Sequence, residues 1–189
     1  MSPRLIFIVG GPGSGKSQLM ADLTAPYQRI PVNQKHPEWV LHDMLRDPAT
    51  GTVIGAELGQ RRGLFAGTDT LASAIIDKAV PWIEVHPYDL ILAEGARLAT
   101  PRFLQSALDA GYDVTVALLD HDQAEPWREE RARKLKRVQN ESYVEVRRSS
   151  ARSFADTAIK LKGRYPVRVW AGHPDDLRQG LQEIIADGG

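Results

Sequence analysis

The stretch Gly10-Gly11-Pro12-Gly13-Ser14-Gly15-Lys16-Ser17 decides the fold of this chain. It matches the pattern G-x-x-x-x-G-K-[ST] at every fixed position. Residues 5–9 before it (LIFIV) are apolar throughout, as in a parallel strand buried on both faces. Leu19, Met20 and Leu23 after it recur at helical spacing. Strand, glycine-rich loop and helix therefore stand in the order that a phosphate-binding loop requires.

The chemistry of this loop is that of a phosphate site. Its glycines allow successive N–H groups and a helix N-terminus to converge on negative charge. Lys16 would reach the β- and γ-phosphates, and the Ser17 hydroxyl would bind Mg²⁺. The residues expected to contact the nucleotide are Gly11, Pro12, Gly13, Ser14, Gly15, Lys16, Ser17 and Gln18. The sequence predicts a nucleoside triphosphate site, and the alternative is a chance glycine-rich turn.

The composition narrows the class of protein. The 189 residues fit one domain, 1–189, with a sizeable core. The 24 basic and 24 acidic residues balance, so no global field indicates a nucleic acid or a membrane as partner. The absence of cysteine excludes disulfides, cysteine zinc sites and thiol catalysis. Neither a membrane span nor a signal peptide is recognisable, so a cytoplasmic protein is expected.

Apolar runs alternate with helical patterns along the chain, which predicts βαβ units in an α/β fold with helices on both faces of a parallel sheet. Further core strands are expected at 89–93, 114–119 and 167–170. Residues 39–58 predict a β-hairpin around a turn at 47–51, and residues 28–32 a short strand interrupted by proline.

Glu94 ends the predicted strand 89–93, at the edge where ligands of an open parallel sheet bind. A carboxylate there can hold Mg²⁺ directly or through water. The alternative is a helix-capping or solvent-facing glutamate, but the position beside the phosphate loop favours the metal. We therefore expect Ser17 and Glu94 to be the metal ligands.

An arginine-rich segment, 128–152, offers cations for a transferring phosphate, because guanidinium groups match phosphate geometry. The preferred residues are Arg131, Arg137, Arg148 and Arg152. The alternative is a solvated helix, which fits Glu129 and Arg133 at i,i+4 spacing.

Asp69 lies in Gly67-Thr68-Asp69, between the predicted hairpin and the strand that ends in Glu94. It could accept the proton of an acceptor hydroxyl as a general base. Composition alone favours Thr68 or Asp69 as the N-cap of a following helix that ends or bends at Pro81. Arg62 could bind an acceptor phosphate or lie in water. The five histidines show no metal spacing, and His121 is expected only to shape a turn.

These motifs together resemble the P-loop kinases of the nucleoside and nucleotide kinase type. The resemblance implies a five-stranded parallel sheet in the order 2-3-1-4-5, with ATP and Mg²⁺ as cofactors. It further implies a lid at about 125–150, an acceptor-side insertion at about 33–70 and Gly172 near the adenine. Arg131 and Arg137 would then act as catalytic cations beside Lys16.

A narrower similarity is to phage-encoded kinases of 5-hydroxymethyluracil in DNA. It rests on Leu58-Gly59, Arg62 and 65–71, followed by 93–98 and Phe103-Leu104. It implies that the acceptor is bound by Arg62, Thr68, Asp69 and Arg97. It also implies that the protein acts in the cytoplasm of a phage host. The neutral net charge counts against a duplex-DNA partner, although 11 of the 24 basic residues fall within 128–162.

Three functions remain open. The first is a kinase for a hydroxyl on a nucleobase or nucleoside, in DNA or free. The second is a nucleoside monophosphate or small-molecule kinase. The third is a regulatory NTPase without an acceptor, against which stands the absence of the guanine-recognition pattern Asn-Lys-x-Asp.

Overall fold

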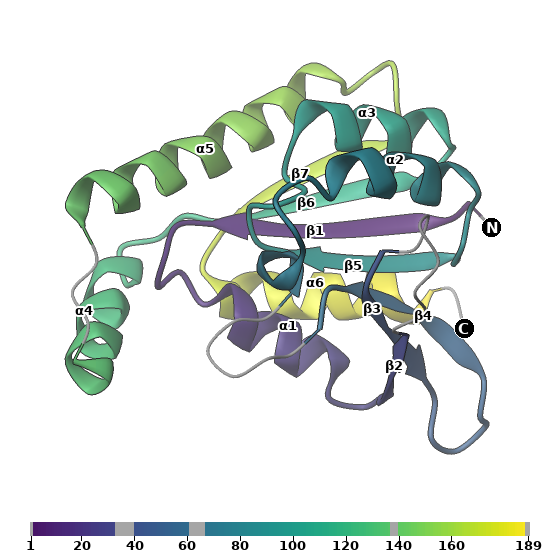
Figure 1. The fold of residues 1–189 in the computed structure, drawn as a ribbon, viewed down its shortest axis with the longest axis horizontal. Coiled ribbons are helices and arrows are strands. Elements are labelled where there is room, and N and C mark those ends of the chain that lie inside the picture. Colours follow the sequence, from purple (N-terminus) through teal and green to yellow (C-terminus); the bar gives the residue numbers. More distant parts are fainter. Residues whose placement is uncertain (1, 33–39, 61–66, 137–139, 188–189) are drawn as a thin grey trace.

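One mixed β-sheet organises the chain in the computed structural model, which describes residues 2–32, 40–60, 67–136 and 140–187 (Figure 1). Within these ranges the sheet has seven strands in the order β2-β3-β4-β5-β1-β6-β7. The strands are β1 Arg4–Gly10, β2 Gln28–Val32, β3 His42–Arg46, β4 Val53–Leu58, β5 Leu90–Glu94, β6 Asp113–Leu119 and β7 Val167–Gly172.

The prediction of a five-stranded parallel sheet is wrong, because the sheet has seven strands and is mixed. Its parallel part is β4-β5-β1-β6-β7, which follows the order 2-3-1-4-5 when β4 is the second strand. The predicted hairpin forms from β3 and β4, yet it is part of the main sheet. The segment 28–32 is β2, which pairs antiparallel with β3 at the edge of the sheet. Proline has no backbone N–H and cannot donate a hydrogen bond to a neighbouring strand. Pro31 is therefore tolerated in β2, which has a partner strand on one side only.

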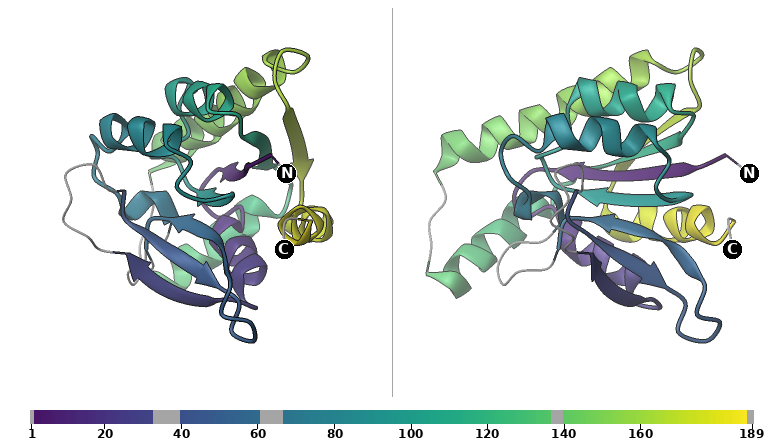
Figure 2. Two further views of the ribbon diagram at one scale, coloured as in Figure 1. Left: turned by 90° about the vertical axis from the view of Figure 1, so that its right-hand side faces the viewer. Right: turned by 45° about the vertical axis from the view of Figure 1, so that its right-hand side comes forward.

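Helices cover both faces of the sheet (Figures 1 and 2). The first face carries α2 (Ile76–Glu84), α3 (Pro101–Asp109) and α5 (Glu141–Lys160). The opposite face carries α1 (Lys16–Thr24) and α6 (Pro174–Ala186). The helix α4 (Ala124–Leu135) lies beyond the ends of the central strands, next to the N-terminal end of α5 (Figure 1).

The strand β1 explains why two cores form. Its side chains alternate between the faces with a period of two. Leu5, Phe7 and Val9 enter the core under α2, α3 and α5, while Ile6 and Ile8 enter the core under α1 and α6. All five are at most 2% exposed, so the run that precedes the glycine-rich loop is buried on both faces as predicted.

The start of α2 corrects one prediction. Residues Gly67–Thr70 form a separate 3-10 helix, η1, and the N-cap of α2 is Ile75, so neither Thr68 nor Asp69 caps this helix. Pro81 does not end α2, which continues to Glu84. The loss of one backbone hydrogen bond at the proline is offset by burial of Ala79, Trp82 and Ile83. Among the helices that the structure describes, none combines the length and hydropathy needed to cross a bilayer.

Candidate active site

The glycine-rich loop joins β1 to α1 and keeps the conformation that its glycines permit. Gly13 has φ +82° and Gly15 has φ +90°, both in the left-handed region that favours glycine. Gly15 is the N-cap of α1 and has no side chain to bond the first-turn N–H groups. The Lys16 Nζ donates to the carbonyl oxygens of Gly10 at 3.0 Å and Gly11 at 2.8 Å. The ammonium group therefore lies over the loop, close to where a phosphate anion would bind.

Glu94 stands opposite the loop on the neighbouring strand β5, where it is level with Ile8 of β1. The Ser17 Oγ donates to Glu94 Oε1 at 3.0 Å. Glu94 is only 2% exposed. Burial raises the pKa of its carboxyl group to about 7, with a smaller contribution in the same direction from Asp69, while Lys16 and the Ser17 hydrogen bond lower it.

The residues at this point fit Mg²⁺. A hydroxyl and a carboxylate oxygen converge there, and Mg²⁺ prefers oxygen ligands. No group of three or more His, Cys, Asp or Glu side chains within the described ranges could form a cage for a metal ion. Mg²⁺ is usually bound by one or two protein groups together with substrate phosphates and water.

Charges of both signs surround Lys16. Burial lowers the pKa of its ammonium group, Glu94 and Asp69 oppose this effect, and Arg131 and Arg147 add to it. Asp69 and Arg131, two residues predicted from different parts of the sequence, therefore both act electrostatically on the loop lysine.

The turn Gly67–Thr70 is docked on the end of β5. Thr68 is fully buried, and its Oγ1 donates to the Glu94 carbonyl oxygen at 2.8 Å. The backbone N–H of Ala96 donates to Asp69 Oδ1 at 3.3 Å. Gly67 has φ +60°, and a Cβ atom added there would lie 2.5 Å from the Glu94 Cγ, which leaves room only for glycine. These contacts replace the helix cap that composition favoured.

The other predicted residues are distributed around this centre. Arg148 of α5 packs on the loop, because a Cβ atom added at Gly11 would lie 3.6 Å from the Arg148 Cβ. Arg152 instead binds Asp120 through two hydrogen bonds, at 2.7 and 3.0 Å. Arg97 is exposed beside Ala96. Gln18 is exposed and donates to Asp22, away from the loop glycines. Arg62 and Arg137 lie outside the described residues.

Sequence reasoning missed an aromatic cluster at the loop. His121, Trp127 and His173 contact one another with ring centroids 4.7–5.2 Å apart. The His121 Nε2 donates to the Ser14 carbonyl oxygen at 3.0 Å. A Cβ atom added at Gly15 would lie 3.1 Å from the Trp127 ring. His121 follows β6, Trp127 belongs to α4 and His173 is the N-cap of α6. No local sequence pattern therefore connects the three residues.

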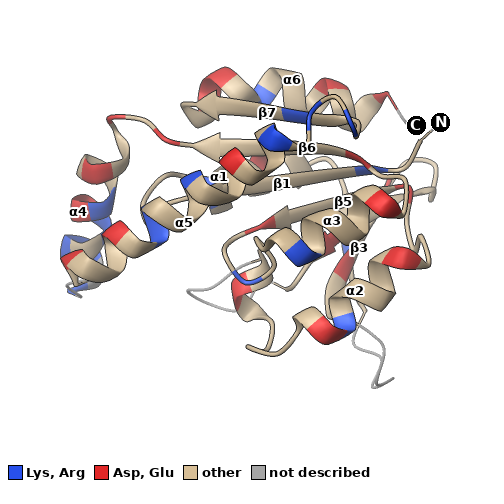
Figure 3. Cartoon of the chain, turned by 90° about the horizontal axis from the view of Figure 1, so that it is seen from above, with Lys and Arg blue, Asp and Glu red and all other residues tan. Residues whose placement is uncertain are grey.

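Basic residues, interspersed with acidic ones, lie on α4 and α5 (Figure 3), the helices that approach the loop. Together with the strand–loop–helix unit, Lys16 and the Ser17–Glu94 pair, they define a P-loop nucleotide-binding protein of the kinase class.

A family model described as P-loop Nucleotide Kinase3 matches residues 1–186, and the chain belongs to this family. Membership supports an ATP-dependent kinase, and P-loop kinases generally use ATP with Mg²⁺. The comparison with curated proteins gives no match.

Proposed function

We propose that this chain transfers the γ-phosphate of ATP to a hydroxyl group on a nucleobase or nucleoside. The observation that carries the proposal is the docking of the Thr68–Asp69 turn on Glu94–Ala96. A regulatory NTPase needs no second carboxylate beside the loop lysine and the metal-binding glutamate. A kinase does, because its acceptor hydroxyl must lose a proton as it attacks.

The donor half consists of residues 11–18. Its N–H groups and Lys16 bind the phosphates, and Arg131 offers a cation for the charge that spreads over the transferring oxygens. Ser17 and Glu94 would hold Mg²⁺, which neutralises phosphate charge when bound. The rings of Trp127 and His173, which meet edge to face next to Gly172, would lie against the adenine.

The acceptor half is built on Asp69. Its carboxylate takes the proton of the acceptor hydroxyl, whose oxygen forms a bond to the γ-phosphorus. The bond between the γ-phosphorus and the bridging oxygen breaks, and ADP leaves. Thr68, bound to the end of β5, fixes the turn, and Arg97 is available for a phosphate of the acceptor.

The finer proposal is that the acceptor is 5-hydroxymethyluracil in DNA, modified in the cytoplasm of a phage host. It rests on the similarity of 58–71 and 93–104 to phage-encoded kinases. In this proposal residues 1–189 form one kinase domain, with 33–70 as the acceptor-side insertion and 125–150 as the lid.

The test offers ATP labelled at the γ-phosphate, with Mg²⁺, to free nucleosides, nucleoside monophosphates, and DNA with and without hydroxymethylated uracil. Label in the modified DNA alone supports the finer proposal. Label in a free nucleoside supports the general one, whereas label in a monophosphate alone makes the protein a nucleoside monophosphate kinase. Release of labelled phosphate without transfer to any acceptor contradicts the proposed kinase and leaves a regulatory NTPase.

A further inference from the structure

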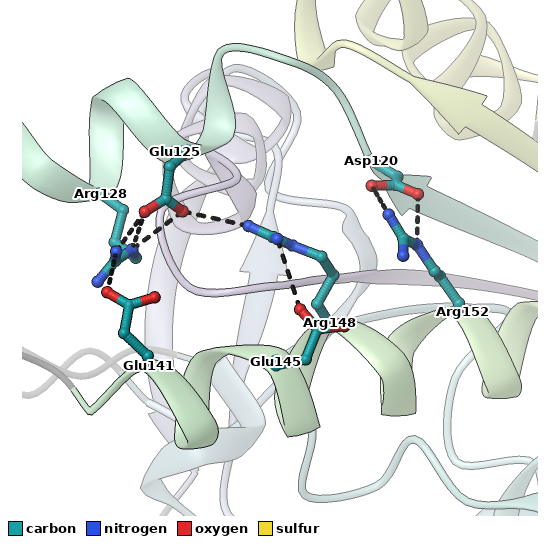
Figure 4. A network of polar contacts seen from close by, with 7 residues as sticks. All are labelled: Asp120, Glu125, Arg128, Glu141, Glu145, Arg148 and Arg152. Carbon is teal, nitrogen blue, oxygen red and sulfur yellow. Dashed lines mark hydrogen bonds and ion pairs between the residues drawn. The ribbon is translucent and has the colours of Figure 1, made fainter.

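A chain of ion pairs begins on one side of the glycine-rich loop, at Arg128 of α4. A Cβ atom added at Gly13 would lie 2.6 Å from the Arg128 Cβ, so α4 is seated directly on the loop. Arg128 is only 7% exposed. Its Nε donates to both carboxylate oxygens of Glu125, at 3.0 and 3.1 Å, and its Nη2 donates to Glu141 at 3.0 Å. These bonds fix the Glu125 carboxylate relative to the loop (Figure 4).

The same carboxylate reaches α5. Glu125 Oε2 accepts a hydrogen bond from Arg148 Nη2 at 3.2 Å, and Arg148 Nη1 lies 3.7 Å from Glu145 Oε2 (Figure 4). The opposite side of Arg148 faces the loop, where its Nε would be 3.8 Å from a Cβ atom added at Gly11. The two terminal nitrogens of this guanidinium group are thus directed at carboxylates, while the Nε is nearer the loop.

The chain of contacts therefore begins at Gly13 and returns to the loop at Gly11, through Arg128, Glu125 and Arg148. A guanidinium group has five N–H donors, so the bond to Glu125 leaves donors for a phosphate. An arginine that is already held beside its ligand loses less side-chain freedom when the ligand binds. Hydrogen bonds from Arg128, followed by those from Arg148, hold the pKa of Glu125 below its ordinary value, so the carboxylate is charged at neutral pH.

We propose that Glu125 is a positioning residue of the nucleotide site, which holds Arg148 beside the glycine-rich loop so that its guanidinium group binds a phosphate of ATP. The proposal rests on the nucleotide site of the proposed function and adds to it the residue that orients one of its cations. Two other roles for Glu125 are possible. The carboxylate could compete with phosphate for Arg148, or it could have the purely structural role of joining α4 to α5.

The test is a double-mutant cycle on the dissociation constant of ATP, measured by calorimetry on the full chain with Mg²⁺. It compares Glu125→Gln, Arg148→Gln and the double variant, with Glu129→Gln as a control for loss of an exposed carboxylate on the same helix. Each single variant is expected to weaken ATP binding about tenfold, as for loss of one charged hydrogen bond. The double variant is expected to bind ATP about as weakly as Arg148→Gln, because Glu125 acts through Arg148.

Two results would overturn the proposal. Additive losses, about a hundredfold in the double variant, would mean that Glu125 acts independently of Arg148. Tighter binding by Glu125→Gln would make the carboxylate a competitor.

Glu125→Asp guards against a folding defect in Glu125→Gln. It keeps the charge opposite Arg128 but shortens the reach to Arg148, so ATP binding should weaken severalfold with an unchanged melting temperature; unchanged binding would refute the proposal. ATP binding is measured without an acceptor. A chain that binds ATP but transfers no phosphate would therefore contradict the proposed function and not the role of Glu125.

Discussion

Replacement of Glu94 by glutamine separates the effect of this buried carboxylate on folding stability from its proposed role as a Mg²⁺ ligand. Glu94 is 2% exposed, and burial raises its pKa from 4.5 to about 7. At about 1.4 kcal/mol per pKa unit, ionisation of Glu94 in the folded chain costs roughly 3 kcal/mol. A raised pKa means that the folded chain favours the neutral carboxyl group. The stability that the neutral group contributes is fully present below pH 4.5 and is lost as the pH rises through about 7.

Glu94→Gln resembles the neutral carboxyl group at every pH. At pH 8 the ligand-free variant should therefore be more stable than the natural chain by about 3 kcal/mol, or roughly 6–12 °C in melting temperature for a chain of this size. At pH 5 the difference should fall below about 1 kcal/mol. The same variant should lose Mg²⁺-dependent phosphate transfer, since an amide cannot replace the charged ligand.

The assay is thermal unfolding without nucleotide or metal at pH 5 and pH 8, followed by phosphate transfer. Glu129→Gln, at an exposed position of α4, is the matched control and should show no comparable pH-dependent gain. The reasoning is refuted if Glu94→Gln melts no higher than the natural chain at pH 8, or if the gain is equal at both pH values.

Three further substitutions test individual residues. Asp69→Asn should lower kcat by about a hundredfold with ATP affinity nearly unchanged, because a general base acts on the acceptor; kinetics with near-normal kcat would remove Asp69 from catalysis. Arg131→Gln should lower kcat more than ATP affinity, because its contact strengthens in the transition state, and an equal loss in both would indicate simple binding. Trp127→Ala should weaken ATP binding by about twofold to tenfold but leave inorganic tripolyphosphate binding unchanged, if its ring stacks on the base; equal losses for both ligands, measured by calorimetry, would contradict this.

The glycine-rich loop and its place in the fold could be predicted from the sequence because their signals are local. The glycines, Lys16 and Ser17 lie in one short stretch of sequence. The two apolar strands that lead to the site, β1 and β5, end at Gly10 and Glu94. Position at the end of a buried parallel strand led to the expectation that Glu94 lies beside the loop, and in the structure the Ser17 Oγ donates to Glu94 Oε1 at 3.0 Å.

The edge of the sheet could not be predicted in the same way. The hairpin of β3 and β4 was predicted from its turn, but the strand β2 is short, and its antiparallel pairing with β3 depends on contacts between segments rather than on any pattern within it. The resemblance to P-loop kinases led to five parallel strands, one of them near residues 28–32. The chain instead uses β4 in that place and extends the sheet beyond it.

The turn Gly67–Thr70 and the surroundings of the loop depend on tertiary contacts. Thr68 and Asp69 precede a helical pattern, so a cap was the local interpretation, but both residues bond to the end of β5. His121 and Trp127 reach the loop from different elements, and Glu125 joins two arginines that are 20 positions apart. Pairings of this kind leave no periodic signal in a single sequence.

Phosphate transfer by the Lys16→Ala variant tests the central claim most directly. Lys16 lies over the loop, with its Nζ 2.8 Å from the Gly11 carbonyl oxygen and 3.0 Å from that of Gly10. The natural chain is expected to move label from the γ-phosphate of ATP to an organic acceptor, and Lys16→Ala should lose at least about a hundredfold in this rate with its fold intact. If Lys16→Ala transfers phosphate at the natural rate, residues 10–17 are not the donor site and the account is wrong.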